Sequence, residues 1–324
     1  MNKTLLTACA ATLLAALAGP AARAQAPAWP SKPIRIVVPY PPGGSSDIIA
    51  RAISQPLADA LKTTVIVENK PGANGNTGTD FVAKSPPDGY TILLCDVGAL
   101  AITSSVYTKL PFDPAKDLVG ITMLAYSPHL LVVHPSVAAN NLKELVAFSK
   151  TGKLDFAVTA IGSAPHLAGV AVEKATGAKW VYIPYKGGSQ AIGDTVAGQT
   201  QVLMNGMLAT LPFVQSGKLK VLGVSKSTRV PLLPNVPTIA EQGVAGFESG
   251  TWQGVLLPKG TPPEIVAKLN AELTRIIRSP EVRSRLTAQG AEVYTMTPTE
   301  FSAFFDREQK RWATVVAAGG VKLD

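Results

Sequence analysis

Three segments of the sequence place glycine beside serine where an apolar run gives way to a helical pattern. They are residues 39–47 (PYPPGGSSD), 159–166 (TAIGSAPH) and 184–189 (PYKGGS). The N-terminus of a helix presents unpaired N–H groups and the positive end of its dipole, so it attracts anions. One such junction is usually an ordinary turn. Three of them predict a shared site for a small anionic molecule.

The acid–base residues of these junctions each have two interpretations. Asp47 could act as a base, but three residues after Gly44 it is better placed to cap the helix or to hydrogen-bond an opposing domain. His166 lies in the first helical turn of the second junction, where it could face a ligand or hold its own loop. We expect Gly44 to adopt a positive φ, a conformation that glycine tolerates and that a side chain would disfavour.

Catalytic and metal-binding patterns are weak in this sequence. His129 and His134 flank the apolar run 130–133, and opposite ends of a strand cannot share a metal. The sequence contains no G-x-S-x-G, CxxC or HExxH motif. Residues 72–78 (GANGNTG) lack the GxGxxG spacing and are predicted to form a turn before a helix that begins near Thr79. We therefore expect no cofactor and no metal, and an exported hydrolase that uses Asp47, Ser163 and His166 is the weaker alternative.

The N-terminal residues have the pattern of an export signal. Lys3 precedes an apolar stretch at 5–18, and Ala22-Arg23-Ala24 is an A-x-A cleavage site, so the mature chain is expected to begin at Gln25 in the periplasm. A membrane anchor is the alternative, but the stretch is shorter than the roughly 20 residues that a spanning helix needs.

The charge and cysteine content narrow the function classes further. Removal of Lys3 and Arg23 lowers the formal net charge from +8 to +6. The remaining positive charges are scattered, which argues against nucleic acid as a partner and fits either attraction of acidic ligands or simple solubility. Cys95 is then the remaining cysteine, in an apolar run typical of a buried, inert thiol.

Apolar runs and helical patterns alternate along the chain, which predicts an α/β protein with largely parallel sheets and two domains. Helix-start patterns at 261–264 and 297–300 punctuate a helical C-terminal region, and the aromatic residues that follow are interpreted as core. Strands are predicted at 34–38, 65–67, 91–94, 130–133, 156–159, 180–183, 201–204, 220–224 and 255–257.

The chain resembles the Bug family, the periplasmic solute receptors of tripartite tricarboxylate transporters. The resemblance covers essentially the whole mature chain, and it rests on VPYPPGGSSDIIAR (38–51), VENKPGANGNTGTDFVAKSPPDGYTILL (67–94), YTKLPFDPAKDL (107–118), HLLVVHPS (129–136), GSAPHLAG (162–169), IPYKGGSQAI (183–192), LPNVPTIAEQG (233–243) and AQGAEV (288–293).

The resemblance implies a two-lobed, type II-like binding-protein fold of the Venus flytrap kind, with the ligand in a cleft between the lobes. Lobe 1 would use residues 25–126 and 248–324, and lobe 2 would use residues 127–247. The chain would cross between the lobes near Ser127 and Phe247. Loops from both lobes would then meet across one cleft.

The same resemblance implies a carboxylate ligand held mainly by main-chain amides and hydroxyl groups. Matched by motif, the contacts from lobe 1 would be Tyr40, Pro42, Gly43, Gly44, Ser45, Ser46, Asp47, Gly98 and Ala99. Those from lobe 2 would be Thr159, Gly162, Ser163, His166, Tyr185, Lys186, Gly187, Gly188 and Asn205. At Asn205 family members often carry an acidic or amide residue, so a ligand amine loses one possible partner here.

The implied function is capture of a small organic anion (a carboxylate, dicarboxylate or amino acid) by lobe closure. The receptor, expected to be a monomer and not an enzyme, would then deliver the ligand to a two-component membrane permease. A sensor that docks to a signalling partner instead of a permease is the alternative that the sequence leaves open.

Overall fold

The computed structural model describes residues 29–323. The expected leader and its cleavage site after Ala24 lie outside the described residues. The chain divides into a unit at Met1–Ser31, of which 29–31 are described, and a compact unit that begins at Lys32. No helix within 29–323 combines the length and the apolar character needed to cross a membrane.

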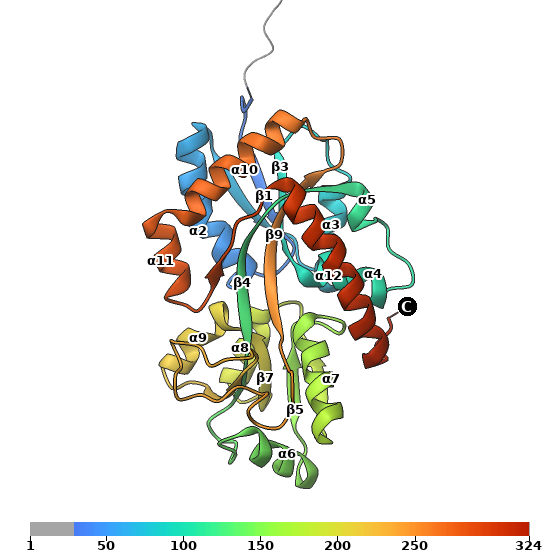
Figure 1. The fold of residues 1–324 in the computed structure, drawn as a ribbon, viewed down its shortest axis with the longest axis vertical. Coiled ribbons are helices and arrows are strands. Elements are labelled where there is room, and N and C mark those ends of the chain that lie inside the picture. The colour runs from blue at the N-terminus through green and yellow to red at the C-terminus, as the bar shows by residue number, and fades with distance from the viewer. Residues whose placement is uncertain (1–28, 324) are drawn as a thin grey trace, which may run out of the picture. The chain divides into compact units, whose positions relative to one another are not determined.

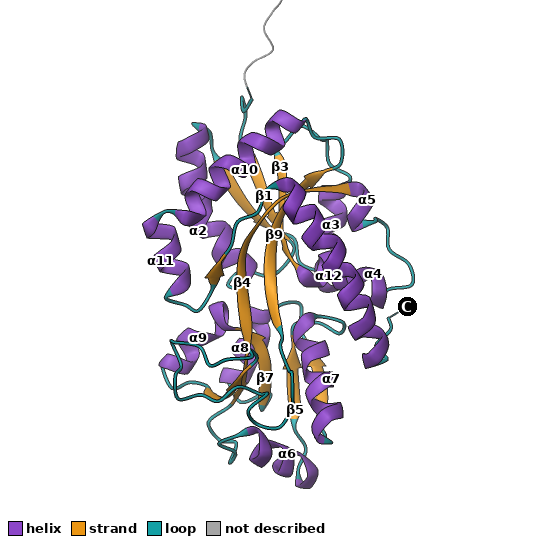
Figure 2. Ribbon diagram, viewed as in Figure 1, coloured by secondary structure: helices purple, strands orange, loops and turns teal. Residues whose placement is uncertain are grey.

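The compact unit contains two groups of α/β elements, which we call lobe 1 and lobe 2 (Figures 1 and 2). Lobe 1 contains β1 (Ile34–Val38), α2 (Ser45–Leu61), β2 (Val65–Asn69), the 3₁₀ turn η1 (Ala73–Gly75), α3 (Asn76–Ala83), β3 (Thr91–Asp96), the π-helical turn η2 (Gly98–Ile102), α4 (Thr103–Val106), α5 (Pro114–Asp117), α10 (Pro263–Arg278), α11 (Pro280–Thr287), β10 (Glu292–Val293) and α12 (Pro298–Gly319).

Lobe 2 is built from a contiguous stretch of the chain. It contains α6 (Leu142–Thr151), β5 (Asp155–Val158), α7 (Ala164–Thr176), β6 (Val181–Pro184), α8 (Gly188–Val196), β7 (Val202–Gly206), α9 (Met207–Gln215) and β8 (Lys220–Val224). Its core packs both faces of the sheet, with Phe156 and Met204 in one apolar cluster and Ala157 and Leu203 in the other.

Two long strands, β4 (Leu118–Val133) and β9 (Gly250–Pro258), join the lobes. In Figure 1 they run side by side from the upper lobe into the lower one. β4 pairs with β9 as far as Pro128↔Gly250, and from His129↔Gly206 it pairs with β7. The strand order is β2-β1-β3-β9-β4-β7-β5-β6, with β8 and β10 also on β4.

This topology corrects the expectation of largely parallel sheets. Each lobe has a parallel set, β2-β1-β3 in lobe 1 and β6-β5-β7 in lobe 2. The pairings of β4 and β9 are antiparallel. The sequence predicts only residues 130–133 of β4 because Gly120, Thr122 and Pro128 interrupt its apolar pattern, and two register shifts disturb the same segment.

The C-terminal helix α12 lies against the middle of the joining strands. Phe301 packs where Gly120 of β4 and Gly254 of β9 leave room, since a Cβ at either glycine would overlap its ring. Glu308 Oε2 accepts hydrogen bonds from the indole N–H of Trp252 at 2.8 Å and of Trp312 at 3.1 Å. Phe301, Phe305 and Trp312 are therefore core, as their spacing indicates, whereas Phe304 is only half-buried.

Candidate functional site

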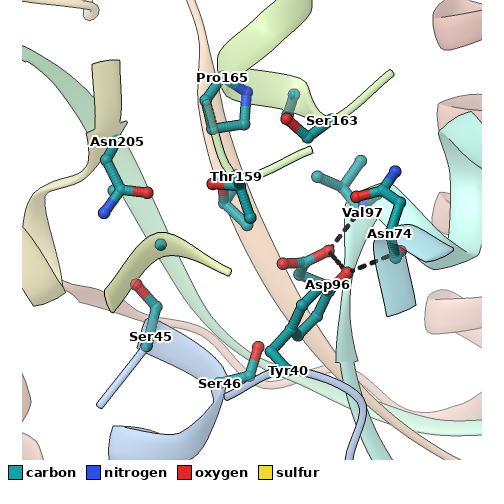
Figure 3. Close-up of a pocket in the computed structure, with 16 residues that line it drawn as sticks. Tyr40, Ser45, Ser46, Asn74, Asp96, Val97, Thr159, Ser163, Pro165 and Asn205 are labelled. Carbon is teal, nitrogen blue, oxygen red and sulfur yellow. Dashed lines mark hydrogen bonds between the residues drawn. The ribbon is translucent and has the colours of Figure 1, made fainter. Parts of the chain in front are cut away.

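A pocket lies where the loops of the two lobes face each other. Parallel strands place the loops after their carboxyl ends at one edge of the sheet. Here the loops after β1, β2 and β3 meet those after β5, β6 and β7 (Figure 3). The lining residues are Tyr40, Gly44, Ser45, Ser46, Asn74, Asp96, Val97, Gly98, Thr159, Ser163, Ala164, Pro165, Gly188, Asn205, Gly206 and Thr251.

Four helix N-termini point at this pocket. The residues at or before the starts of α2, α7, α8 and α9 all belong to its lining. Each contributes unpaired main-chain N–H groups and the positive end of a dipole. Among the lining residues that the structure describes, none is lysine, arginine or histidine. The groups of this lining that can attract an anion are therefore main-chain N–H groups together with neutral polar side chains.

The loop after β1 turns at Gly43, which corrects the expectation for Gly44. Gly43 has φ of +84°, a conformation that favours glycine, whereas Gly44 is an extended N-cap with φ of −80°. Asp47 Oδ2 accepts from the Gly43 N–H at 2.9 Å and from Arg51 Nε at 3.0 Å. Asp47 therefore stabilises the turn from behind, while Gly44, Ser45 and Ser46 line the pocket.

The electrostatics of Asp47 agree with this supporting position. Burial alone would raise the pKa of its carboxyl group. Hydrogen bonds from Arg51, Gly43 and Asn69 outweigh burial and hold the pKa below its usual value. Asp47 is thus an ionised, fully engaged carboxylate, and the local capping interpretation describes its contacts.

The loop after β5 brings Thr159 and Ser163 to the pocket, and it places His166 behind them. His166 Nδ1 accepts from the Gly162 N–H at 3.1 Å, so its proton is on Nε2. Burial lowers the pKa of this histidine to about 4, and its ring packs edge-on against Tyr182. This hydrogen bond is the contact expected if His166 holds its own loop.

The contacts of Ser163 are those of a helix cap. Its hydroxyl donates to Ala160 O at 2.7 Å and accepts from the main-chain N–H of His166. A catalytic serine needs a base at its hydroxyl, and here the imidazole of His166 bonds to Gly162 instead. The hydrolase arrangement of Asp47, Ser163 and His166 is not assembled. No group of three acidic, histidine or cysteine residues within 29–323 could hold a metal ion.

The start of α8 contributes Gly188, and the end of β7 contributes Asn205. The side-chain amide of Asn205 donates to Thr210 Oγ1 at 3.2 Å, and its Oδ1 lies where a Cβ on Gly188 would come within 2.8 Å. Lys186 is exposed and outside the lining. The hydroxyl of Tyr185 points away, donating to Asp194 Oδ2 at 2.8 Å.

The pocket thus contains nine of the residues that the resemblance implies and leaves nine behind or beside it. Those in the lining are Tyr40, Gly44, Ser45, Ser46, Gly98, Thr159, Ser163, Gly188 and Asn205. Those outside the lining are Pro42, Gly43, Asp47, Ala99, Gly162, His166, Tyr185, Lys186 and Gly187. Two of the residues outside the lining bind loop glycines, since Asp47 accepts from Gly43 and His166 accepts from Gly162.

Asp96 is a carboxylate in the lining that the sequence analysis did not identify. Its Oδ1 accepts from the hydroxyl of Tyr40 at 2.6 Å and from the Gly98 N–H at 2.8 Å. Burial raises the pKa of Asp96 to about 6 against the lowering effect of these bonds. Burial also raises the pKa values of Tyr40 and Cys95, so both neighbours are neutral.

Asn74 and Thr251 were also missed. Asn74 follows β2, and Asp96 ends β3, so both stand at the same sheet edge as the loop after β1. That position was the available signal, although the sequence analysis interpreted 72–78 only as a turn. Thr251 comes from β9, where its Oγ1 pairs with His129 Nε2 at 2.8 Å. Burial lowers the pKa of His129 to about 3, so the imidazole that bonds to Thr251 is neutral.

Comparison with known proteins gives consistent matches over nearly the whole chain. The model of the tripartite tricarboxylate transporter family receptor matches residues 49–321. Protein BugT of Bordetella pertussis (strain Tohama I) is 39% identical over 100% of both chains. The periplasmic binding protein BugD is similar with a TM-score of 0.87 and 34% identity, covering 91% of this chain and 99% of BugD.

A second solved structure, MatC (Rpa3494) from Rhodopseudomonas palustris, contains bound malate. Its TM-score is 0.85 at 30% identity, over 89% of this chain and 100% of MatC.

Proposed function

This chain belongs to the tripartite tricarboxylate transporter receptor family, and we propose that it captures a small organic carboxylate in the pocket between its lobes. The family and the two-lobed, type II-like fold implied by the resemblance are confirmed. The chain is a solute-binding receptor, and its location is the periplasm.

The observation that carries the proposal is the convergence of four helix N-termini on a pocket without a basic side chain in its described lining. Backbone donors are preorganised and always protonated, so they suit reversible capture of a carboxylate. The malate bound to MatC shows that one similar protein binds a small dicarboxylate.

For the lobes we propose the division implied by the resemblance, with 25–126 and 248–324 in lobe 1 and 127–247 in lobe 2. The change of β4 from pairing with β9 to pairing with β7 at Pro128–His129 supports it. One lobe would bind the carboxylate first, the joining strands would bend, and the other lobe would complete the hydrogen bonds.

For the site we propose that the lining residues contact the ligand and that the remaining implied residues hold them in place. The hydrogen bonds of Asp47 and His166 to the neighbouring loop glycines support the second group. We further propose that the leader is cleaved after Ala24, that the mature receptor is a non-catalytic monomer, and that it delivers its ligand to a two-component permease.

The test is a titration of the mature protein with di- and tricarboxylates, amino acids and aromatic acids. Binding is measured by thermal unfolding and by calorimetry. A ligand at 100 times its dissociation constant should add about 2.7 kcal/mol to the free energy of unfolding. The diamide of each responding dicarboxylate is the matched control, since it has the same skeleton without the charge. Absence of any response to all the carboxylates would contradict the proposed function.

A further inference from the structure

One wall of the pocket carries a carboxylate, Asp96, to which a plain carboxylate ligand could not donate a hydrogen bond. We call Asp96, Asn74 and Gln253 the donor-reading cluster. Asp96 and Asn74 belong to lobe 1 and to the pocket lining, which Thr159 and Ser163 of lobe 2 also join (Figure 3), whereas Gln253 lies on β9 outside the lining. The cluster places a carboxylate inside a pocket whose other features attract anions.

Asp96 uses one oxygen for the protein and turns the other toward the ligand space. Oδ1 accepts from Tyr40 and Gly98, while in Figure 3 the second carboxylate oxygen faces the middle of the pocket. An ionised carboxylate repels a ligand carboxylate and attracts a hydrogen-bond donor, most strongly a cationic one. Among the described lining residues no lysine, arginine or histidine neutralises it.

Gln253 lies beside Asp96 on the neighbouring strand. The two residues are directly opposite in the antiparallel β3–β9 ladder, so their side chains share one face of the sheet. Thr251, two positions earlier on the same face, lines the pocket. Gln253 is fully buried, and neither its Nε2 nor its Oε1 has a hydrogen-bond partner among the described residues.

Asn74 repeats this pattern on the loop after β2. It is 6% exposed, and its Nδ2 is buried without a hydrogen-bond partner within 29–323. Buried amide groups are nearly always hydrogen-bonded, because leaving one unpaired is costly. In the lining, the unpaired Asn74 N–H needs an acceptor and the free oxygen of Asp96 needs a donor, so together they indicate a polar group of the ligand at this place.

We infer that the cognate ligand is a carboxylate bearing a hydroxyl or ammonium group, which donates a hydrogen bond to Asp96 beside the amides of Asn74 and Gln253. The inference rests on the proposed function and narrows it from carboxylates in general to hydroxy or amino carboxylates. The ligand carboxylate meets the helix N-termini, and its donor group meets the lobe 1 wall. An ammonium group also neutralises Asp96.

The experiment compares ligands that share a carbon skeleton. Calorimetry at pH 7.5 would use propionate, lactate and alanine; succinate, malate and aspartate; and glutarate, 2-hydroxyglutarate and glutamate, with both enantiomers of each chiral ligand. In the series that binds most tightly, the hydroxy or amino member should bind at least about tenfold more tightly than the unsubstituted acid, as expected for one hydrogen bond to a charged group.

Asp96→Asn tests the carboxylate itself. Asparagine keeps an oxygen that can accept from Tyr40 and Gly98, so the wall is preserved while its charge is removed. The tenfold preference should fall to about twofold or less, whereas affinity for the unsubstituted acid should stay equal or rise. Asp194→Asn is the matched control, because Asp194 also accepts from a tyrosine but is not in the lining. It should leave the preference unchanged.

The outcomes separate this inference from the proposed function. If no carboxylate of any series binds, the proposed function fails. If carboxylates bind but the unsubstituted acid binds as tightly as its hydroxy and amino relatives, the inference is wrong and the receptor function stands. An unchanged preference in Asp96→Asn would also overturn the inference.

Discussion

At the scale of single residues, Asp96 is the side chain whose environment departs most from that of its neighbours in the pocket. Its carboxyl group is held by Tyr40 and Gly98, yet burial raises its pKa from 3.8 to about 6. The nearest titratable groups, Tyr40 and Cys95, remain neutral in the same range because burial raises their pKa values too. Neither of these two neighbours changes its charge while Asp96 titrates.

This predicts how Asp96 affects stability in the absence of ligand. Because its folded pKa exceeds the unfolded value, the native state holds more protons between about pH 4 and pH 6. Its contribution is therefore fully present at the acidic end and is lost as the pH rises through this window. Melting temperatures of wild type and Asp96→Asn at pH 4, 5, 6 and 7 should show the wild type losing stability relative to the variant.

The difference between the two melting temperatures cancels the contributions of the other carboxyl groups, because these groups titrate alike in both proteins. Two curves that stay parallel from pH 4 to pH 7 would show that Asp96 has an ordinary pKa in the folded protein. The result would leave the ligand preferences untouched, since those are measured above the window.

At the scale of elements, α12 depends on one buried carboxylate for its position. Glu308 accepts from two indole N–H groups, one on β9 and one on α12 itself. It also pairs with Arg311 at 3.2 Å. Removing the acceptor leaves two donors in a region that water does not reach freely.

We expect Glu308→Ala to lower the free energy of unfolding by about 2–4 kcal/mol, from the cost of two unpaired buried donors. Urea denaturation followed by tryptophan fluorescence measures it. Glu308→Gln keeps an acceptor oxygen and should lose clearly less. Equal losses in the two variants would show that the charge of Glu308, and not its hydrogen bonds, holds the helix.

The elements also show how far the sequence carries the prediction. The capping pattern at 297–300 locates the start of α12 correctly, because capping is a local interaction. β4 escapes prediction over its first twelve residues, since its pairing with β9 depends on residues more than a hundred positions away. Asp96 and Gln253 could not be linked from the sequence for the same reason: a β-ladder joins them.

At the scale of the whole compact unit, the lobes touch through glycine. A Cβ on Gly187 of lobe 2 would overlap the ring of Pro41 in lobe 1, and one on Gly162 would press against Val106. Gly187 is extended, with φ of 177°, so the backbone itself would accept a side chain there. The absence of a side chain at these positions lets the two faces approach.

Gly187→Ala should therefore weaken ligand binding by about 1–3 kcal/mol, the usual range for overpacking, with little change in unfolding of the ligand-free protein. Calorimetry measures the affinity, and small-angle scattering should show a smaller ligand-induced compaction than in wild type. Gly193→Ala, in the same helix, meets nothing within 4 Å and serves as the control. If Gly187→Ala binds the ligand with wild-type affinity, the approach of Gly187 to Pro41 is not needed for lobe closure.

The position of β9 has a consequence for the order in which the protein can fold. β9 separates β3 from β4 in the sheet, yet its residues follow every strand of lobe 2 along the chain. A chain that crosses a membrane from its N-terminus presents β5 to β8 complete before β9 emerges. Until then β3 has an unpaired edge, which is a template for aggregation. Lobe 1, although it begins first, can therefore complete its sheet only after the strands of lobe 2 are available.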